Sequence, residues 1–373
     1  MNGTFRIGNL FGIPFYINSS WFVILGLVTL SYGSGLAGRF PGLPVGVPWL
    51  LGLIAALSLF ASVLAHELGH SLVAIKQGIS VKSITLFLFG GLATLEKESK
   101  TPAEAFWVAI AGPLVSLVLC ALFATILLGT GISGAPAAMV QLLASINFFL
   151  AAFNLIPGLP LDGGNILKAV VWKITGNPYK GVVFAGRVGQ IFGWIAIASG
   201  LIPLIFFGRF NNIWNILIGS FLLQNAGFAA QSATVQDKLA NLTVADAVTP
   251  DSPIVSAEIS LREFANEYVI GKKNWRKFLV TDAERKLLGT ISVDDLKLVA
   301  TSTWPQTQVK ELVQPADAIA VNSNQSLLEV VTLLEQKNLN DVPAIDDNGA
   351  VLGLVEKVRI KSLLVSSAPG TTA

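Results

Sequence analysis

Charged residues, histidine and cysteine are all scarce in this chain. Only 13% of its 373 residues are charged, against about 25% in soluble domains. The single cysteine, Cys120, allows no internal disulfide, so the fold is not a disulfide scaffold. The net charge of +2 does not point to a nucleic-acid partner, and none is expected. These shortages direct attention to the apolar part of the sequence.

The few charges are distributed unevenly. Residues 1–230 carry 11 Lys/Arg and 5 Asp/Glu, whereas residues 231–373 carry 14 Lys/Arg and 18 Asp/Glu. The first part is therefore typical of a membrane domain and the second of a soluble domain. We expect a linker over residues 231–244 and a soluble region over residues 245–373.

Six apolar runs in the first part are long enough to cross ~30 Å of hydrocarbon. They lie near residues 18–36, 49–75, 104–128, 136–156, 182–207 and 210–230. Six crossings put both termini on one side. With a cytoplasmic N-terminus, the inner connectors hold nine Lys/Arg and the outer ones only Arg39 and Arg209, which obeys the positive-inside rule. The sequence therefore predicts a multi-pass protein of the cell (inner) membrane with a cytoplasmic tail.

Both histidines of the chain lie in one stretch, Ala65-His66-Glu67-Leu68-Gly69-His70-Ser71. Positions i and i+4 share a helix face, so the imidazoles of His66 and His70 point into the same volume. Two neutral imidazoles can hold zinc, and an adjacent carboxylate can take a proton from a zinc-bound water. Glu67 is the only charged side chain in residues 49–75, which predicts a function for it. The alternative is a chance match on a buried helix.

A second polar stretch, residues 153–164, holds two prolines and three glycines and must break the fourth apolar run. Because the chain has no third histidine, a three-ligand zinc site needs another donor, and Asp162 is the natural candidate. Asn154 could donate a hydrogen bond to a developing oxyanion. Capping of a helix end is the alternative role for both residues.

Residues 79–97 do not follow a helical pattern. Residues 80–89 are strand-like, Gly90-Gly91 is a turn signal, and residues 92–96 could return as a second strand. Backbone inside a membrane must find hydrogen-bond partners, so this hairpin must be buried in protein or line a wet cavity. The alternative is an interfacial loop of no special use.

These motifs together resemble the site-2 protease family of intramembrane zinc metalloproteases, over about residues 5–230. The matching motifs are His66-Glu67-x-x-His70, Phe89-Gly90-Gly91, Asn154-x-x-Pro157-x-x-Pro160-Leu161-Asp162-Gly163, and near the start Phe11-Gly12-Ile13-Pro14 and Ser20-Trp21. The resemblance implies one zinc held by His66, His70 and Asp162, with Glu67 as general base. It also implies Asn154 near the oxyanion and cleavage of a substrate's transmembrane helix.

The tail contains an internal repeat. Phe278-Leu279-Val280-Thr281-Asp282 is echoed by Val342-Pro343-Ala344-Ile345-Asp346, sixty-four residues on. Each copy is predicted as strand, helix, strand, strand, helix, and two such copies, about 245–302 and 308–365, resemble a CBS pair. CBS modules often bind adenine nucleotides, so the resemblance makes an adenine nucleotide an expected ligand of the tail.

The two copies differ at the positions of the family's ribose-binding pattern. The first has Gly289-x-x-Ser292-x-x-Asp295, which resembles that pattern, and the second departs from it with Glu356 and Arg359. Ser292 and Asp295 are therefore the predicted nucleotide-binding residues. The alternative is a purely structural or dimerising module.

The sequence thus predicts a polytopic α-helical membrane domain with about six spans and a small β-hairpin, followed by a soluble α/β CBS pair. The expected activity is zinc-dependent cleavage of transmembrane segments, modulated by the cytoplasmic CBS domains. Expected partners are a membrane-anchored substrate such as a regulator, the lipid bilayer, an adenine nucleotide, and a second copy bound through the CBS domains. The rival interpretation is a CBS-gated metal-ion channel or transporter that uses His66, Glu67 and Asp162 as its permeation site.

Overall fold

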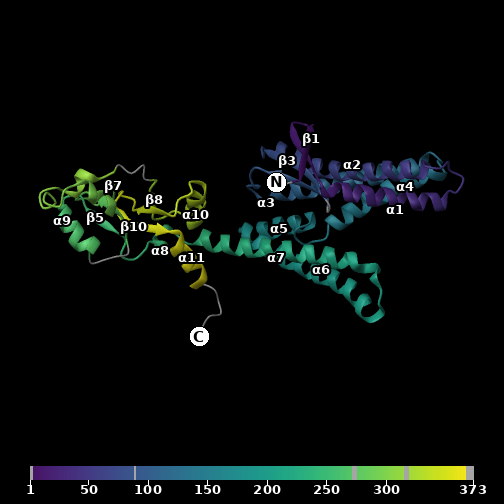
Figure 1. Ribbon diagram of the computed structural model, residues 1–373. Coiled ribbons are helices and arrows are strands. Elements are labelled where there is room, and N and C mark those ends of the chain that lie inside the picture. Colours follow the sequence, from purple (N-terminus) through teal and green to yellow (C-terminus); the bar gives the residue numbers. More distant parts are fainter. Residues whose placement is uncertain (1–2, 88–89, 271–274, 315–318, 367–373) are drawn as a thin grey trace. The chain divides into compact units, whose positions relative to one another are not determined.

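The computed structural model describes residues 3–87, 90–270, 275–314 and 319–366 (Figure 1). The chain divides into two compact units, Met1–Thr234 and Val235–Ala373. Each unit has its own sheets and its own buried apolar clusters.

Six helices are long and apolar enough to cross a membrane, and each coincides with one predicted apolar run. Between 11% and 33% of the most apolar window of each helix is buried, so most of these side chains face outward, as lipid contact requires. The helices are α1 (Ser20–Arg39), α2 (Val47–Lys76), α3 (Pro102–Gly129), α4 (Gly134–Asn154), α6 (Pro178–Phe207) and α7 (Ile213–Asn241).

A four-stranded sheet lies at one end of α1 and α2 (Figure 1). Its strands, in order, are β1 (Thr4–Leu10), β2 (Ile13–Asn18), β3 (Val81–Phe87) and β4 (Gly90–Leu95). β1 and β2 form one antiparallel hairpin, β3 and β4 form another, and β2 runs parallel to β3. Within the described residues, β4 is therefore one edge of the sheet.

Apolar side chains anchor this sheet to the helices. Alternate residues of β2 are buried together with Ile84 and Leu86 of β3, against Trp21 of α1 and Phe60 of α2. The sequence analysis predicted the second hairpin and made no prediction of the first. Gly90 and Gly91 open β4 instead of forming the turn, because they pair with Phe87 and Leu86. Phe89 lies outside the described residues.

The predicted break after the fourth span is followed by a helix that the sequence analysis did not predict. Helix α4 ends at Asn154, residues 155–161 form turns, and α5 (Asp162–Thr175) begins directly at the predicted zinc ligand. Helix α5 packs against α3 and α6. The break thus turns the chain so that the first residue of α5 faces the helix pair α2 and α3.

The second unit contains two three-stranded sheets, one for each repeat. The first repeat has β5 (Ile254–Ser256), α9 (Leu261–Phe264) continued as a π-helix (Ala265–Ile270), β6 (Lys277–Thr281), β7 (Leu287–Ser292) and the 3₁₀ helix η3 (Val293–Leu298). The second has β8 (Val321–Asn322), α10 (Leu327–Gln336), β9 (Asp341–Ile345), β10 (Val351–Glu356) and α11 (Lys357–Ser366). Both copies follow the predicted order of strand, helix, strand, strand and helix.

Short helical pieces α8 (Val244–Ala247) and η4 (Val309–Leu312) precede the two repeats. Residues 231–241, which the sequence analysis assigned to a linker, are helical and end α7. Leu239 explains part of this difference, because it is buried in the core of the second repeat with Val244, Leu327 and Val330.

Candidate active site

His66 and His70 lie on one face of α2, and both are buried, at 2% and 9% exposure. Each imidazole is held through its Nδ1 atom. His70 Nδ1 donates to the carbonyl oxygen of Val108, at 2.7 Å, and His66 Nδ1 lies 2.9 Å from the hydroxyl of Ser116. Both partners belong to α3. A ring nitrogen that donates to a carbonyl carries the proton, so the Nε2 lone pair of His70 is free to bind a metal.

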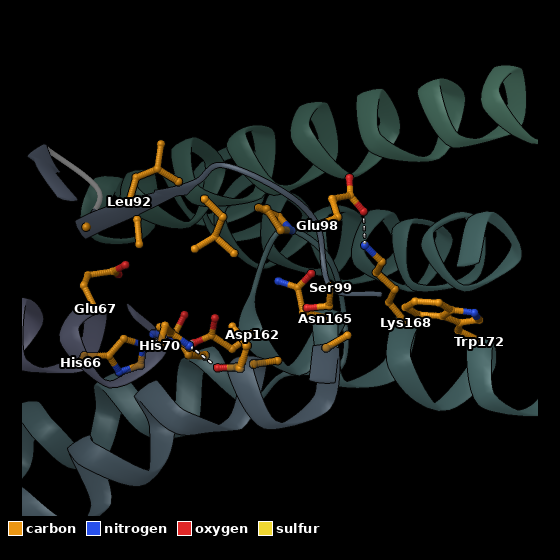
Figure 2. A pocket seen from close by; sticks show the side chains of 18 residues that line it. His66, Glu67, His70, Leu92, Glu98, Ser99, Asp162, Asn165, Lys168 and Trp172 are labelled. Atoms are coloured by element: carbon orange, nitrogen blue, oxygen red, sulfur yellow. Dashed lines mark hydrogen bonds and ion pairs between the residues drawn. The ribbon is translucent and has the colours of Figure 1, made fainter. Parts of the chain in front are cut away.

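Asp162 completes the cluster from the start of α5. Its Oδ2 atom lies 3.0 Å from His66 Nε2 and 3.3 Å from His70 Nε2, and the two Nε2 atoms are 3.3 Å apart. Figure 2 shows the two imidazoles and this carboxylate turned toward one another. Ligands at about 2.0–2.2 Å around a tetrahedral zinc lie about 3.3–3.5 Å from each other. The three donor atoms therefore fit one zinc ion.

Gly112 of α3 leaves the space between these donors open. A methyl group at this position would overlap His70 Nε2 and would lie 2.7 Å from His66 Nε2. Any side chain here would therefore enter the volume on which the lone pairs converge. Sequence reasoning missed this role, because a glycine in an apolar helix is more simply explained by close helix packing.

Glu67 points from α2 toward β4 (Figure 2). The backbone N–H of Ala93 is directed at its carboxylate. A methyl group on Gly91 would lie 2.8 Å from Glu67 Cδ and 2.9 Å from Oε1, so position 91 must lack a side chain to admit Glu67. The hairpin therefore covers the predicted general base.

A cavity of about 320 Å³ joins these groups, and Asn154 also lines it. The Nδ2 atom of Asn154 donates to the carbonyl oxygen of Leu150, at 3.0 Å. All five predicted site residues of the first unit thus border one cavity. The sequence analysis missed its extension along α5, which Asn165, Lys168 and Trp172 line. Their spacing from Asp162, at i+3, i+6 and i+10, was the available signal.

The two predicted nucleotide-binding residues of the tail are differently placed. Asp295 is buried, and its Oδ2 atom accepts a 2.7 Å hydrogen bond from the backbone N–H of Ser292. Its Oδ1 atom accepts a 3.0 Å hydrogen bond from the side chain of Gln314. The contact with Ser292 belongs to the capping box of η3, and the contact with Gln314 occupies the second carboxylate oxygen. Neither Ser292 nor Asp295 lines the tail's cleft of about 560 Å³.

That cleft lies between the two repeats. It is lined by Trp275, Arg276, Lys277 and Thr290 of the first repeat and by Asp341 and Pro343 of the second, among others. An aromatic ring and two cationic side chains at its edge were not singled out from the sequence. No motif in the sequence marks them, because Lys277 begins strand β6 and the other two residues directly precede it.

Comparison with known proteins gives matches to both parts of the chain. Residues 54–134 and 131–196 match the model of peptidase family M50, and residues 244–300 and 309–366 match the CBS domain. A Synechocystis protein named "Putative zinc metalloprotease sll0528" is 58% identical over 371 residues, which is 99% of this chain and 97% of that protein.

Two further relatives are more distant. The Mycobacterium tuberculosis protein named "Putative zinc metalloprotease Rip3" is 33% identical, over 98% of this chain and 93% of its own. The solved structure of a site-2 protease from Methanocaldococcus jannaschii is 28% identical and covers 61% of this chain and 95% of that one, with a TM-score of 0.43. With the buried His-His-Asp cluster, six membrane-compatible helices and a near full-length metalloprotease relative, this chain belongs to peptidase family M50, the site-2 protease family of membrane zinc metalloproteases, and carries a C-terminal CBS pair.

Proposed function

We propose that this protein is an intramembrane endopeptidase that cleaves the transmembrane segment of a membrane-anchored substrate. His66, His70 and Asp162 would hold the zinc, and Glu67 would act as general base. One observation carries the proposal: three donor atoms within 3.0–3.3 Å of one another share a cavity with Glu67 inside a set of apolar helices.

A zinc ion held by His66, His70 and Asp162 would supply Lewis-acid chemistry at the scissile carbonyl and a lowered pKa for the attacking water. Val108 and Ser116 keep both imidazoles oriented, because each holds an Nδ1 atom. Glu67 accepts the proton of the water and delivers it to the leaving amine. Asn154 has a second amide hydrogen beyond the one given to Leu150, and this hydrogen would be donated to the developing oxyanion.

The substrate would bind in an extended form. The carbonyl groups of a transmembrane helix are hydrogen-bonded within the helix, so the segment must unwind before a peptide bond can be attacked. β4 is an edge strand within the described residues, and Gly91, Leu92 and Ala93 line the cavity. An unwound substrate would add to this edge as a further strand, and its backbone hydrogen bonds would replace those of the helix.

The direct test pairs zinc analysis with a cleavage assay on the purified full-length protein in vesicles. The expected result is about one zinc per chain and cleavage of a model transmembrane peptide, with cleavage but not zinc lost in Glu67→Gln. Unchanged cleavage in Glu67→Gln would contradict the proposed base. Zinc flux into vesicles that contain the protein, without any peptide cleavage, would favour the channel or transporter interpretation.

We further propose that the tail is cytoplasmic, in the cell membrane orientation given by the distribution of Lys/Arg, and that it senses an adenine nucleotide. Trp275 beside the inter-repeat cleft could stack on a base, and Arg276 and Lys277 could bind phosphates. Calorimetry with ATP, ADP and AMP tests binding, and the cleavage assay with the tightest of them tests coupling. Absence of nucleotide binding in calorimetry would leave dimerisation or substrate recruitment as the role of the tail. Sedimentation tests separately whether the CBS domains form a homodimer.

A further inference from the structure

We propose that Lys168 forms a recognition subsite in the catalytic cavity that binds an acidic side chain of the substrate, about three residues from the cleaved bond. The inference rests on the proposed endopeptidase function. It adds a chemical requirement on the substrate, which neither the zinc cluster nor the family assignment supplies.

Lys168 belongs to the same cavity as the donor cluster. It lies on α5, six positions after Asp162, and lines the cavity with Asn165 and Trp172 of the same helix face. Only 19% of its side chain is exposed. Figure 2 shows Lys168 and Trp172 on the side of Asp162 away from Glu67. The cavity therefore has Glu67 and Asp162 at one end and, at the other, a largely buried cation beside the exposed Glu98.

The partner of Lys168 is loosely held. Its Nζ atom lies 3.4 Å from Glu98 Oε2, and the Glu98 side chain is 88% exposed. A pair with one largely exposed member contributes little stability, because that carboxylate loses little when it returns to water. An incoming substrate carboxylate can therefore replace Glu98 at Lys168 while Glu98 regains its hydration.

The spacing sets the position of the substrate residue. Six residues of helix rise about 9 Å at 1.5 Å per residue. An extended peptide advances about 3.3 Å per residue, so a chain that passes the zinc cluster and continues along α5 reaches Lys168 after about three residues. Asn165 lies midway and offers a neutral amide to the intervening backbone. An acidic side chain nearer the cleaved bond would instead meet Glu67 and Asp162.

A phospholipid headgroup is the other anion that a Lys and Trp pair could bind near a membrane surface. The shared cavity favours the peptide. The cavity that Lys168 lines also contains His66 and Asp162, so a group bound at Lys168 lies in the space that the substrate must enter.

The experiment uses full-length, zinc-loaded protein in phosphatidylcholine vesicles. Single-span model peptides would differ at one residue, Asp, Asn or Lys, moved one position at a time on both sides of the cleaved bond, which mass spectrometry of the products locates. We expect Asp about three residues from that bond to lower KM about tenfold relative to Asn with little change in kcat, because the contact binds ground state and transition state alike. The preference should disappear in Lys168→Gln and turn toward the Lys peptide in Lys168→Glu.

Lys173→Gln is the matched control, because Lys173 lies on the same helix but is exposed and does not line the cavity. It should keep the tenfold preference for Asp. Equal preference for Asp in wild type and Lys168→Gln would overturn the subsite. Affinity that follows the fraction of added phosphatidylglycerol, whatever the charge of the peptide, would assign Lys168 to lipid instead.

A binding measurement separates this inference from the proposed function. In zinc-loaded Glu67→Gln, the Kd of the Asp peptide should be about tenfold lower than that of the Asn peptide, and additional Lys168→Gln should equalise them. Equal affinities without the second change contradict the subsite. Tighter binding of the Asp peptide by a wild-type protein that cleaves no peptide would contradict the endopeptidase function and leave the subsite standing.

Discussion

Asp162 and Asp295 are both carboxylates near the start of a short helix, and their partners differ. Asp162 faces His66 Nε2 and His70 Nε2, two ring nitrogens that need not carry protons. These two nitrogens and the carboxylate oxygen can therefore all face one cation. Asp295 accepts hydrogen bonds from the Ser292 backbone and the Gln314 side chain. In the membrane domain the carboxylate lies beside ring nitrogens that can bind a cation, whereas in the tail it lies beside N–H donors.

This difference separates a binding group from a structural one. A carboxylate grouped with the lone pairs of two imidazole nitrogens is stabilised by a bound cation. A carboxylate whose two oxygen atoms already accept from N–H groups has its demand met within the chain, and it gains little from a ribose hydroxyl. The comparison favours the proposal that His66, His70 and Asp162 would hold a metal in the first unit, and that a nucleotide in the tail would depend mainly on the cleft residues.

Removal of Asp162 should have the largest effect. We expect Asp162→Ala to lower zinc content from about one per chain to nearly none, because two imidazoles alone leave the site a ligand short. His66→Ala and His70→Ala should do the same. Metal analysis of the purified variants checks this, with Asn165→Ala as the control, since Asn165 lines the same cavity but offers no donor to the cluster. Full zinc occupancy in Asp162→Ala would remove Asp162 from the ligands and weaken the contrast with Asp295.

Glu67→Gln should keep zinc and lower the cleavage rate by about 10²–10⁴-fold, the usual contribution of a general base. The amide matches the carboxylate in shape but cannot accept the proton of the water. Cleavage rate and zinc content are measured on the same preparation. A rate near that of wild type would make Glu67 structural, so that both units would contain a structural acid without a chemical role.

The cluster of His66, Glu67 and His70 was predictable because polar and ionisable side chains inside an apolar span are energetically costly. The only two histidines of the chain and a lone glutamate inside an apolar run have few structural explanations. Asp162 followed by elimination, because few acidic residues occur in residues 1–230. The six long helices followed from length and hydropathy, and the order of strands and helices in the tail followed from the repeat.

Other features depended on contacts that no local pattern encodes. The pairing of β2 with β3 joins residues about seventy positions apart, and α5 follows a run of turns whose direction the sequence leaves open. Ser116 and Gly112 look like ordinary packing residues of an apolar helix until the imidazoles are placed beside them. The pattern around Ser292 and Asp295 fits a ribose contact and a helix cap equally, since both use an acidic residue three positions after a serine.

Ser116→Ala removes the hydroxyl that orients the His66 imidazole and leaves all three predicted zinc ligands in place. We expect zinc affinity to fall about 10–100-fold, because His66 loses the contact that orients its ring. Ser71→Ala is the matched control: Ser71 is also fully buried, and its hydroxyl has no hydrogen-bond partner among the described residues. Competition with a zinc-binding dye measures both affinities. Equal affinities in the two variants would show that the Ser116 contact does not support the metal site.

Asp295→Asn tests the tail's side of the comparison. The single amide oxygen of Asn can replace one of the two carboxylate oxygens that accept hydrogen bonds from Ser292 and Gln314. The free energy of unfolding of residues 235–373 should therefore fall by about 1 kcal/mol and the melting midpoint by a few degrees. Asp294→Asn is the neighbouring control, since the contacts of the Asp294 side chain within the described residues are exposed ion pairs with Arg276 and Lys297, and its replacement should leave the midpoint unchanged. An Asp295→Asn tail that melts like wild type but loses nucleotide affinity would reverse the assignment of Asp295 to structure.

The smallest expected effect concerns Asp246, an exposed acid that caps α8. The Thr243 backbone N–H and hydroxyl, at 2.8 and 2.9 Å, hold the pKa of Asp246 below its usual range. Because the pKa of Asp246 is lower in the folded state, the cap contributes its full stability to the fold at pH values above the unfolded-state pKa of ~4. This contribution is lost as the pH falls through the folded-state pKa. Asp246→Ala should therefore lower stability by about 0.5 kcal/mol at pH 7, at the low end for caps because the pair is solvent-exposed. Thermal melts of wild type and variant should converge as the pH falls toward 3. A difference that persisted unchanged at pH 3 would assign the loss of stability to packing rather than to the charge of Asp246. Asp246 would then no longer count, with Asp295, as a tail carboxylate that stabilises the fold by accepting hydrogen bonds.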